Sequence, residues 1–398
     1  MVPEDAPARL RCIHTAATRA FVRDDVPPVP WASRSDEEVG MTAAQTTAET
    51  PVLARVEGRV GHLTLNRPAA INALDASMVA AVTEALAAWE HDRAVTSVLL
   101  DGAGDRGLCA GADVRALRRA VLDGEAERAL DFLRAEYRLD ARIAEYPKPV
   151  LALMDGITMG GGVGLSAHAS LRVVTERSRV AMPETRIGFV PDVGGSHLLA
   201  RAPGLTGVHL GVTAGTAGPG DAVYAGLADH FLPADSLPEL TARVLADGDP
   251  AAAVHALAVT PPDGTLASHR AWIDECYDAP TALEVVRRLA AHPHPDARET
   301  AEVIRSLSPT AVEVALATLT RARGTSLRAA LQQELRSGTG LAARADFTEG
   351  IRAQLVDKDR RPRWDPPTLE QVDPAVVAAV LDTPVPPLFP APEPPGAA

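Results

Sequence analysis

The chain is poor in lysine and in cysteine. Only two of its 39 basic side chains are lysines, Lys148 and Lys358, which leaves few residues for Schiff-base chemistry. The three cysteines, Cys12, Cys109 and Cys276, lie far apart in the sequence and form neither a disulfide framework nor a zinc-binding pattern. We therefore expect a reducing compartment, the cytoplasm, and no metal held by cysteine.

Long apolar runs and an excess of positive charge are also missing. No run approaches the ~18 residues of a membrane span, and residues 1–40 lack an apolar secretory segment, so we expect neither membrane insertion nor export. The net charge of −13, without a basic stripe, argues against a general nucleic-acid binder. An anionic small ligand is still allowed, because it needs only a local cationic patch or a helix N-terminus.

The 398 residues are long enough for more than one domain and divide into four parts by composition. Residues 1–50 are rich in Ala, Thr, Pro and charge without apolar periodicity, so we expect disorder, with Met41 as an alternative start. Residues 51–245 alternate strands with helices and predict an α/β core, and residues 246–375 predict a helical region. We expect an extended or disordered proline-rich tail over 376–398.

Local patterns place the main elements of the core. The runs Val52–Glu57 and Val60–Leu65 flank a turn and predict a hairpin, and Asp75 suits the N-cap of a helix ending near His91. Further apolar runs predict strands over 97–101, 149–154, 171–175 and 179–181, and an amphipathic pattern predicts a long helix over about 125–146.

The most informative segment is Met154–Gly164, in which three consecutive glycines join a strand to a helix. Glycine permits tight turns and close approach of another group, and the first amides of the helix lack acceptors. This geometry suits a phosphate or an oxyanion. A nucleotide P-loop is excluded because no lysine follows, and the dinucleotide pattern fits poorly because seven residues separate the strand from its first glycine.

Two interpretations of the glycines then remain open. They allow tight packing of the helix on a sheet, or they form half of an oxyanion hole. An oxyanion hole requires a second main-chain donor, and the loop Leu108–Asp113, which also joins a strand to a helix, is a candidate for it.

In their order along the chain, these segments resemble the crotonase (enoyl-CoA hydratase/isomerase) superfamily. The matching pieces are Leu65-Asn-Arg-Pro68 with Asn72-Ala-Leu74, Cys109–Asp113, Met154–Gly164 and Met182-Pro-Glu184. The resemblance implies a spiral core of repeated ββα units with a helical C-terminal region. It also implies that Ala112 and Gly161 supply the amides that hold a thioester oxygen. The segments Leu65–Pro68, Asn72–Leu74 and Ala110–Asp113 would line a coenzyme A pocket.

Within the superfamily the chain more closely resembles the 3-hydroxyisobutyryl-CoA hydrolases. The similarity rests on Glu136-Tyr137, Gly156–Gly164, Met182–Gly188 and Pro191–Gly195, and on a downstream stretch from Asp346 to Trp364 that extends it to about residue 372. It implies valine breakdown, an acyl-CoA thioester as substrate, and no metal or redox cofactor, because coenzyme A is part of the substrate. A homo-oligomer is expected from the superfamily, unless the C-terminal helices cover that surface.

One departure from the hydratase pattern affects the expected chemistry. Hydratases use two glutamates around one water molecule, and the first of these positions is Gly164 here, whereas the second is Glu184. A single carboxylate beside an oxyanion hole suits acyl transfer to water. Glu184 is therefore the expected catalytic carboxylate, either as general base or as the nucleophile of a mixed anhydride; its alternative is an ordinary acid in the first turn of a helix.

The resemblance also assigns roles to other polar residues. Asp192, otherwise an Asx-turn residue, would accept a hydrogen bond from the substrate 3-hydroxyl, and Glu136, otherwise a solvated helix acid, would act on the substrate side. Arg67 and Arg115 are candidates to meet the phosphates of coenzyme A, although surface arginines are common.

We therefore expect a thioesterase that hydrolyses 3-hydroxyisobutyryl-CoA. The first rival is an enoyl-CoA hydratase or isomerase with a displaced second acid, and the second is a non-catalytic acyl-CoA-binding protein. A nicotinamide oxidoreductase is a distant third alternative, because its only support is the poorly fitting glycine pattern.

Overall fold

The larger of two sheets opens with the predicted hairpin. In the computed structural model, β1 (Val52–Glu57) pairs antiparallel with β2 (Val60–Leu65), and Val52 lies opposite Leu65. Gly58 has a φ of 59° in the turn, a conformation that glycine adopts without strain. The hairpin confirms the prediction from its two apolar runs.

The structure describes residues 50–390. The expected disorder of the N-terminal extension and the alternative start at Met41 lie outside the described residues, as do Cys12 and the last eight residues of the tail.

Four further strands extend this sheet in parallel. They are β3 (Ser97–Gly102), β4 (Val150–Leu153), β6 (Leu171–Val174) and β9 (His230–Phe231), and the spatial order is β1-β2-β3-β4-β6-β9. The central strands β3 and β4 are covered on both faces, which explains the apolar runs over 98–100 and 150–153. A second sheet has the order β5-β7-β8, formed by β5 (Ile157–Met159), β7 (Arg179–Ala181) and β8 (Thr216–Ala217).

Helices connect the parallel strands and follow local capping signals. Asp75 caps the first one, since its side chain accepts a hydrogen bond from the Met78 amide at 3.0 Å, as predicted. The helices of this part are α1 (Ala76–Glu90), α2 (Val114–Leu122), α3 (Ala126–Ala144), α4 (Gly161–Ala167), α5 (Gly195–Leu199), α6 (Thr206–Thr213) and α7 (Pro219–Tyr224), with the 3₁₀ turns η1 (Pro68–Ala70) and η2 (Glu184–Ile187).

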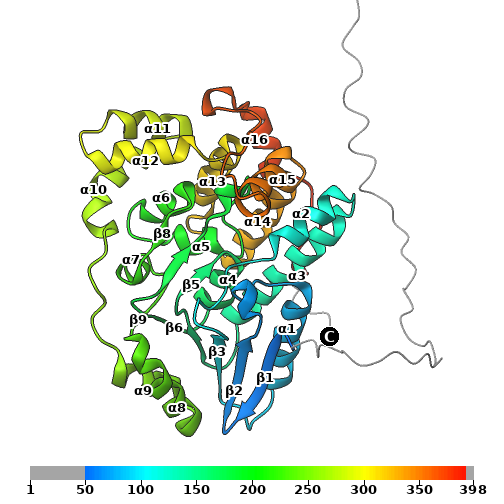
Figure 1. Cartoon of the computed structure of the whole chain (residues 1–398), viewed down its shortest axis with the longest axis vertical. Coiled ribbons are helices and arrows are strands. Elements are labelled where there is room, and N and C mark those ends of the chain that lie inside the picture. Colours follow the sequence, from blue (N-terminus) through cyan, green and yellow to red (C-terminus); the bar gives the residue numbers. More distant parts are fainter. Residues whose placement is uncertain (1–49, 391–398) are drawn as a thin grey trace, which may run out of the picture. The chain divides into compact units, whose positions relative to one another are not determined.

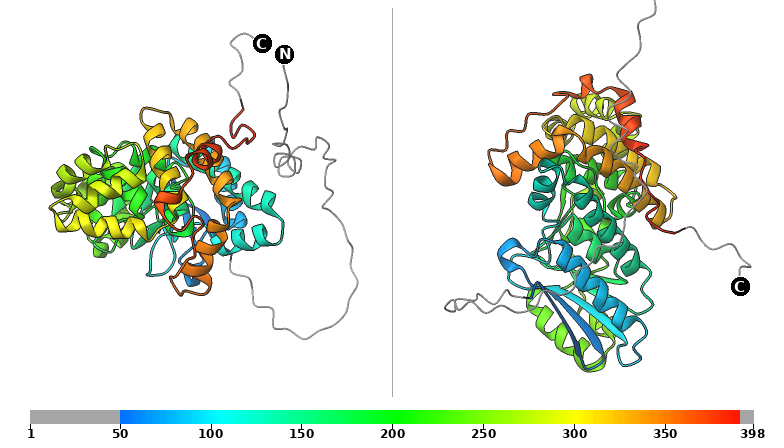
Figure 2. Two further views of the ribbon diagram at one scale, coloured as in Figure 1. Left: turned by 90° about the horizontal axis from the view of Figure 1, so that it is seen from above. Right: turned by 90° about the vertical axis from the view of Figure 1, so that its right-hand side faces the viewer.

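The two faces of the large sheet are covered by different helices (Figure 2). Side chains of β2 to β4 alternate, so that Leu63, Leu100 and Ala152 pack on the side of α1 and α3. The intervening residues pack against α8 (Leu237–Asp247) and α9 (Pro250–Leu257) on the other side. The expected boundary between core and helical region at 245 therefore falls inside α8.

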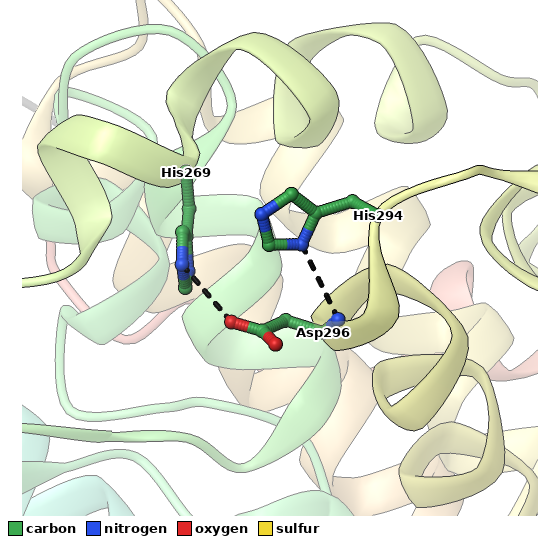
Figure 3. Close-up of side chains that lie close together, drawn as sticks. All are labelled: His269, His294 and Asp296. Carbon is green, nitrogen blue, oxygen red and sulfur yellow. Dashed lines mark hydrogen bonds and ion pairs between the residues drawn. The ribbon is translucent and has the colours of Figure 1, made fainter.

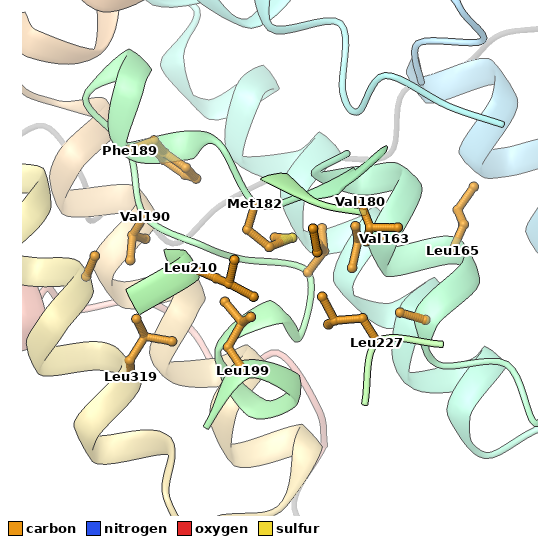
Figure 4. Close-up of a cluster of buried hydrophobic side chains, with 14 of the residues drawn as sticks. Val163, Leu165, Val180, Met182, Phe189, Val190, Leu199, Leu210, Leu227 and Leu319 are labelled. Carbon is orange, nitrogen blue, oxygen red and sulfur yellow. The ribbon is translucent and has the colours of Figure 1, made fainter. Parts of the chain in front are cut away.

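The C-terminal region is helical, as predicted, and packs on the core (Figure 1). Its elements are α10 (Leu266–Tyr277), α11 (Ala282–Ala291), α12 (Pro295–Arg305), α13 (Pro309–Ala322), α14 (Leu327–Ala342), α15 (Ala345–Ile351), the π-helical turn η4 (Arg352–Val356), η5 (Leu369–Gln371) and α16 (Pro374–Leu381). The 3₁₀ turn η3 (Ala234–Ser236) comes earlier and leads into α8. Leu319 of α13 lies beside Leu199 and Leu210 of the core (Figure 4). Within the described range, no helix combines the length and hydropathy needed to cross a bilayer.

The predicted start of the tail at residue 376 is wrong, because it lies inside α16. Asp373 caps this helix by accepting a hydrogen bond from the Ala375 amide at 2.8 Å, and Val380 and Leu381 are buried. The chain beyond it is also docked: the Leu388 amide donates to Gln332 at 2.7 Å, and Arg138 donates to the Leu388 carbonyl at 3.0 Å. The proline content of the segment favoured a disordered tail, and the contacts that order it could not be predicted because they involve residues far away in the sequence.

Candidate active site

One cavity of about 940 Å³ lies between the core and the C-terminal helices. It is bordered by the loops after β2 and β3, by α2 and α3, by the turn before α4, by η2 and by the region from α14 to η4. All of the residues selected from the sequence line this one cavity, namely Arg67, Ala110, Ala112, Arg115, Glu136, Gly161, Glu184 and Asp192. The structure thus brings the predicted set together, and the role of each residue stays a prediction.

The two glycine-containing turns lie side by side at this cavity. The Cys109 amide donates to the Ile157 carbonyl at 3.1 Å and the Met159 amide to the Cys109 carbonyl at 2.9 Å, which holds the loop after β3 against β5. A Cβ on Gly111 would lie 3.6 Å from the Gly161 nitrogen, and Gly111 has a φ of 102°. Only glycine allows this approach without strain.

The amides of Ala112 and Gly161 make no hydrogen bond within residues 50–390. Gly161 is the first residue of α4 and has no intrahelical acceptor, and the adjacent Asp113 amide, in contrast, donates to the Leu74 carbonyl at 2.7 Å. Two unused main-chain donors therefore line one wall of the cavity, as an oxyanion hole requires.

Glu184 lies next to these turns. It begins η2 after Pro183, and its side chain is buried, with Oε1 2.9 Å from the position that a Cβ on Gly160 would take. Its Oε2 has no hydrogen-bond partner among the described residues. Burial, together with the nearby charge of Asp192, raises the pKa of Glu184 well above its ordinary value. A carboxyl group in this state keeps its proton to a higher pH than an ordinary glutamate does, as a group that exchanges protons with a substrate or water requires.

Asp192 is held by a tyrosine that the sequence did not single out for a role. The hydroxyl of Tyr137 donates to Asp192 Oδ2 at 2.7 Å, and both side chains are buried. Burial raises the pKa of Asp192 to about 7, while the hydrogen bond from Tyr137 opposes this shift. The ordinary Asx-turn that the sequence allowed is thus replaced by a buried carboxyl group facing the cavity.

The turn that carries Asp192 is strained and firmly held. Val193 has a φ of 51°, a rare and costly conformation for a β-branched residue. The Glu334 carboxylate on α14 accepts hydrogen bonds from the Gly194 and Ser196 amides at 2.8 and 2.9 Å. On the other side, His168 Nε2 donates to the Val193 carbonyl at 2.8 Å, and burial lowers the pKa of His168 to about 4, so the ring is neutral. These contacts fix the direction of the Asp192 carboxyl group.

Glu136 is buried rather than solvated. Its Oε1 lies 2.2 Å from the position of a Cβ on Gly161 and has no partner in the described part of the chain. Burial and the charge of Asp192 raise its pKa well above the ordinary range. One turn later on α3, Asp140 is also buried, and neither of its oxygens has a described partner.

Gly164 leaves no room for the missing hydratase glutamate. A Cβ at this position would lie 2.7 Å from Val193 Cβ and 2.8 Å from Asp140 Oδ1. The space in which a side chain of residue 164 would begin is therefore filled by these two residues. A glutamate substituted at position 164 would therefore not fit without moving its neighbours.

The two arginines selected for phosphate contact differ in their surroundings. Arg67 donates to the Ala73 carbonyl and lies 3.1 Å from Asp75 and 3.6 Å from Asp113, so its charge is already compensated. Arg115 is exposed and makes no ion pair with any described residue. It is the better placed of the two for an anion.

The C-terminal region supplies a wall that sequence reasoning missed. Phe347, Leu355 and Lys358 line the cavity, and the Phe347 ring lies 5.4 Å from that of Phe189. In the sequence, the stretch from Asp346 onward shows only its similarity to the hydrolases and gives no sign of this position. Arg118 on α2 donates to the Thr348 carbonyl at 2.9 Å, which closes this wall against the core.

The comparisons with known proteins agree with this architecture. The family described as enoyl-CoA hydratase/isomerase matches residues 60–381. The mitochondrial 3-hydroxyisobutyryl-CoA hydrolases of Gallus gallus and Homo sapiens are 37% and 36% identical to this chain, and the matches cover 83% and 82% of it and 88% and 87% of those proteins.

Two solved structures with other names also match closely. A carnitinyl-CoA dehydratase from Mycobacterium thermoresistibile is 48% identical, with a TM-score of 0.82 over 85% of this chain and 98% of that chain. An enoyl-CoA hydratase from Rhodobacter sphaeroides is 43% identical, with a TM-score of 0.79 over 83% and 97%. The chain belongs to the enoyl-CoA hydratase/isomerase family.

Proposed function

We propose that this protein is a thioesterase that hydrolyses 3-hydroxyisobutyryl-CoA to 3-hydroxyisobutyrate and free coenzyme A, a step of valine breakdown. The observation that carries the proposal is one cavity lined by two free main-chain amides and the carboxyl group of Glu184, together with a closed position at Gly164. The relatives named 3-hydroxyisobutyryl-CoA hydrolase, matched over most of both chains, support the same substrate.

In the proposed reaction the thioester oxygen lies between the amides of Ala112 and Gly161. Attack on the carbonyl carbon moves negative charge onto this oxygen, and preorganised donors stabilise that charge more than they stabilise the ground state. Glu184 takes the proton from the attacking water, and a proton passes to the sulfur as the carbon–sulfur bond breaks. Attack by Glu184 itself, followed by hydrolysis of the anhydride, uses the same geometry.

The acyl group would be recognised by Asp192 and Glu136. The Asp192 oxygen not used by Tyr137 is free to accept a hydrogen bond from a 3-hydroxyl group. A buried carboxyl group of this kind discriminates against acyl groups without the hydroxyl, because they leave it unpaired. We propose that Arg115 and Lys358 at the cavity meet the phosphates of coenzyme A, and that no further cofactor takes part.

A hydratase is the second candidate, because two well-matched structures carry hydratase or dehydratase names. The second acid would then be Asp192 or Glu136, since both line the cavity with Glu184. Against it stands the filled space at Gly164, from which a hydratase would present its first glutamate.

A free-thiol assay on the full chain separates these functions. We expect thiol release from 3-hydroxyisobutyryl-CoA, and much slower release from isobutyryl-CoA, which lacks only the hydroxyl. Loss of enoyl absorbance from crotonyl-CoA without free thiol would instead establish the hydratase. Retention of acyl-CoA without turnover of any of these three thioesters would instead indicate a binding protein.

We propose a cytoplasmic location from the sequence alone. Isolated cysteines favour the cytoplasm, whereas the names of the animal relatives place those proteins in mitochondria.

A further inference from the structure

A second cluster of chemically active side chains lies outside the cavity, between two C-terminal helices. His269 is on α10, and His294 and Asp296 lie at the start of α12 (Figure 3). One possible ligand atom from each residue lies within 4.8 Å of the others. Within the described range, these three residues are the group of histidine, cysteine or acidic side chains close enough together to hold a metal ion. None of them lines the cavity, so the proposed reaction does not explain them.

The spacing of two of these atoms is that of metal ligands. His269 Nε2 lies 3.1 Å from Asp296 Oδ2. In a tetrahedral zinc site, bonds of 2.0–2.1 Å put neighbouring ligand atoms about 3.3 Å apart. Only the His294 ring has to move closer for all three atoms to reach one ion.

The rings are already held in place by packing. Trp272, buried one turn after His269, lies 5.4 Å from the His269 ring and stacks on the His294 ring at 6.0 Å with 26° between the planes. The two imidazole rings are themselves 5.4 Å apart. Pro293 and Pro295 restrict the backbone on both sides of His294.

The protonation of the two histidine rings is compatible with coordination of a metal ion. His294 Nδ1 accepts a long hydrogen bond of 3.3 Å from the Asp296 amide, so this nitrogen carries a lone pair and no proton, and binding of an ion there would replace that hydrogen bond. His269 Nε2 binds an ion when its ring proton moves to Nδ1. Because 22% of the His269 side chain and 48% of the Asp296 side chain are exposed, water has access to the remaining positions.

We propose that His269, His294 and Asp296 bind a divalent transition metal, with zinc as the expected ion, and that this ion ties α10 to the start of α12. Two imidazoles and one carboxylate suit zinc and its neighbours in the first transition row better than magnesium or calcium. The site is independent of the proposed function, and the ion takes no part in the reaction.

A second histidine pair provides the control. The rings of His230 in β9 and His255 in α9 are also 5.4 Å apart, but no acid joins them within the part of the chain that the structure describes. Both places thus have two neighbouring imidazole rings, and what distinguishes the proposed site is the carboxylate of Asp296.

The test is zinc titration by calorimetry on the untagged, metal-stripped full chain, with cobalt absorption spectra as a report of coordination. We expect one tight site per chain, weakened at least tenfold by His269→Ala and by Asp296→Asn and unchanged by His255→Ala. Because Asp296 is half exposed, its variant keeps the test valid if the histidine variant fails to fold. Equal zinc affinity in wild type and both cluster variants, or loss of the site in His255→Ala, would overturn the proposal.

Discussion

Buried carboxyl groups occur in two regions of this molecule and differ in their partners. In the C-terminal helices, the partly buried Glu313 accepts hydrogen bonds from the Ala282 and Leu283 amides, and the buried Asp346 accepts from the Ser308 hydroxyl and the Asp365 amide. Around the cavity, oxygens of Glu136, Asp140 and Glu184 have no partner among the described residues.

Burial is therefore not what distinguishes a functional acid here. The pKa values of Glu313 and Asp346 are raised by burial as well. A buried carboxyl group without donors costs free energy that the folded chain must supply from its other contacts. Such a group is retained where a substrate or water completes its hydrogen bonds, which is the condition at a catalytic site.

The largest expected effect comes from Glu184→Gln. Removing the general base or nucleophile should lower kcat for thiol release by about 10²–10⁴ while the free energy of unfolding stays unchanged or rises. The raised pKa means that Glu184 ionises only above the usual glutamate range. As the pH is lowered, wild-type kcat/KM should therefore begin to fall at a higher pH than it would with an ordinary glutamate.

Glu313→Gln is the matched control for this comparison. It changes a partly buried glutamate whose oxygens accept hydrogen bonds from two amides outside the cavity. It should lower stability and leave kcat intact. Activity of Glu184→Gln close to wild type would remove Glu184 from the mechanism.

A smaller effect is expected on substrate choice. Asp192→Asn should reduce the preference for 3-hydroxyisobutyryl-CoA over isobutyryl-CoA by roughly ten- to a hundredfold, because a hydrogen bond to a charged group contributes about 1.5–3 kcal/mol. Tyr137→Phe should act less strongly, since it only releases the Asp192 carboxyl group.

The ratio of kcat/KM values for the two thioesters measures this preference. Tyr277→Phe is the control, because Tyr277 is another buried tyrosine, whose hydroxyl meets His209 Nδ1 at 3.0 Å outside the cavity. A preference unchanged in Asp192→Asn would show that Asp192 does not contact the hydroxyl.

Local signals predicted the parts of the fold that depend on neighbours in sequence. The hairpin followed from two apolar runs around a turn, and the helix after Asp75 followed from its capping residue. The pairing of the two glycine turns was inferred because each joins a strand to a helix and an oxyanion hole needs two main-chain donors. Short-range patterns thus located the floor of the cavity.

Residues whose environment depends on distant segments were not predictable. Glu136 lies in an Arg-Ala-Glu-Tyr-Arg sequence typical of an exposed helix face, yet the packing of α3 on α4 buries it. Glu334 lies 138 positions from Ser196, whose amide it binds, and nothing near it in sequence indicates that contact. The wall formed by Phe347 was missed for the same reason.

The smallest expected effect compares Asp140→Ala with Asp346→Ala in urea unfolding. Both changes remove the same atoms, but only the second breaks hydrogen bonds, which Asp346 accepts from the Ser308 hydroxyl at 2.6 Å and from the Asp365 amide at 2.8 Å. Asp346→Ala should therefore lower the free energy of unfolding by about 1–3 kcal/mol, whereas Asp140→Ala should lower it less or raise it.

The pH dependence decides whether Asp140 belongs with the cavity acids. Burial, followed by the charge of Glu136, raises its pKa well above the ordinary value, so the fold favours its neutral form. Its stabilising contribution is complete below the pKa of an unfolded aspartate and is lost as the pH rises toward the folded pKa. The stability of Asp140→Ala relative to wild type should thus improve from pH 4 upward. A difference that stays constant with pH would mean that an undetected donor holds the Asp140 carboxylate, as Ser308 and Asp365 hold Asp346.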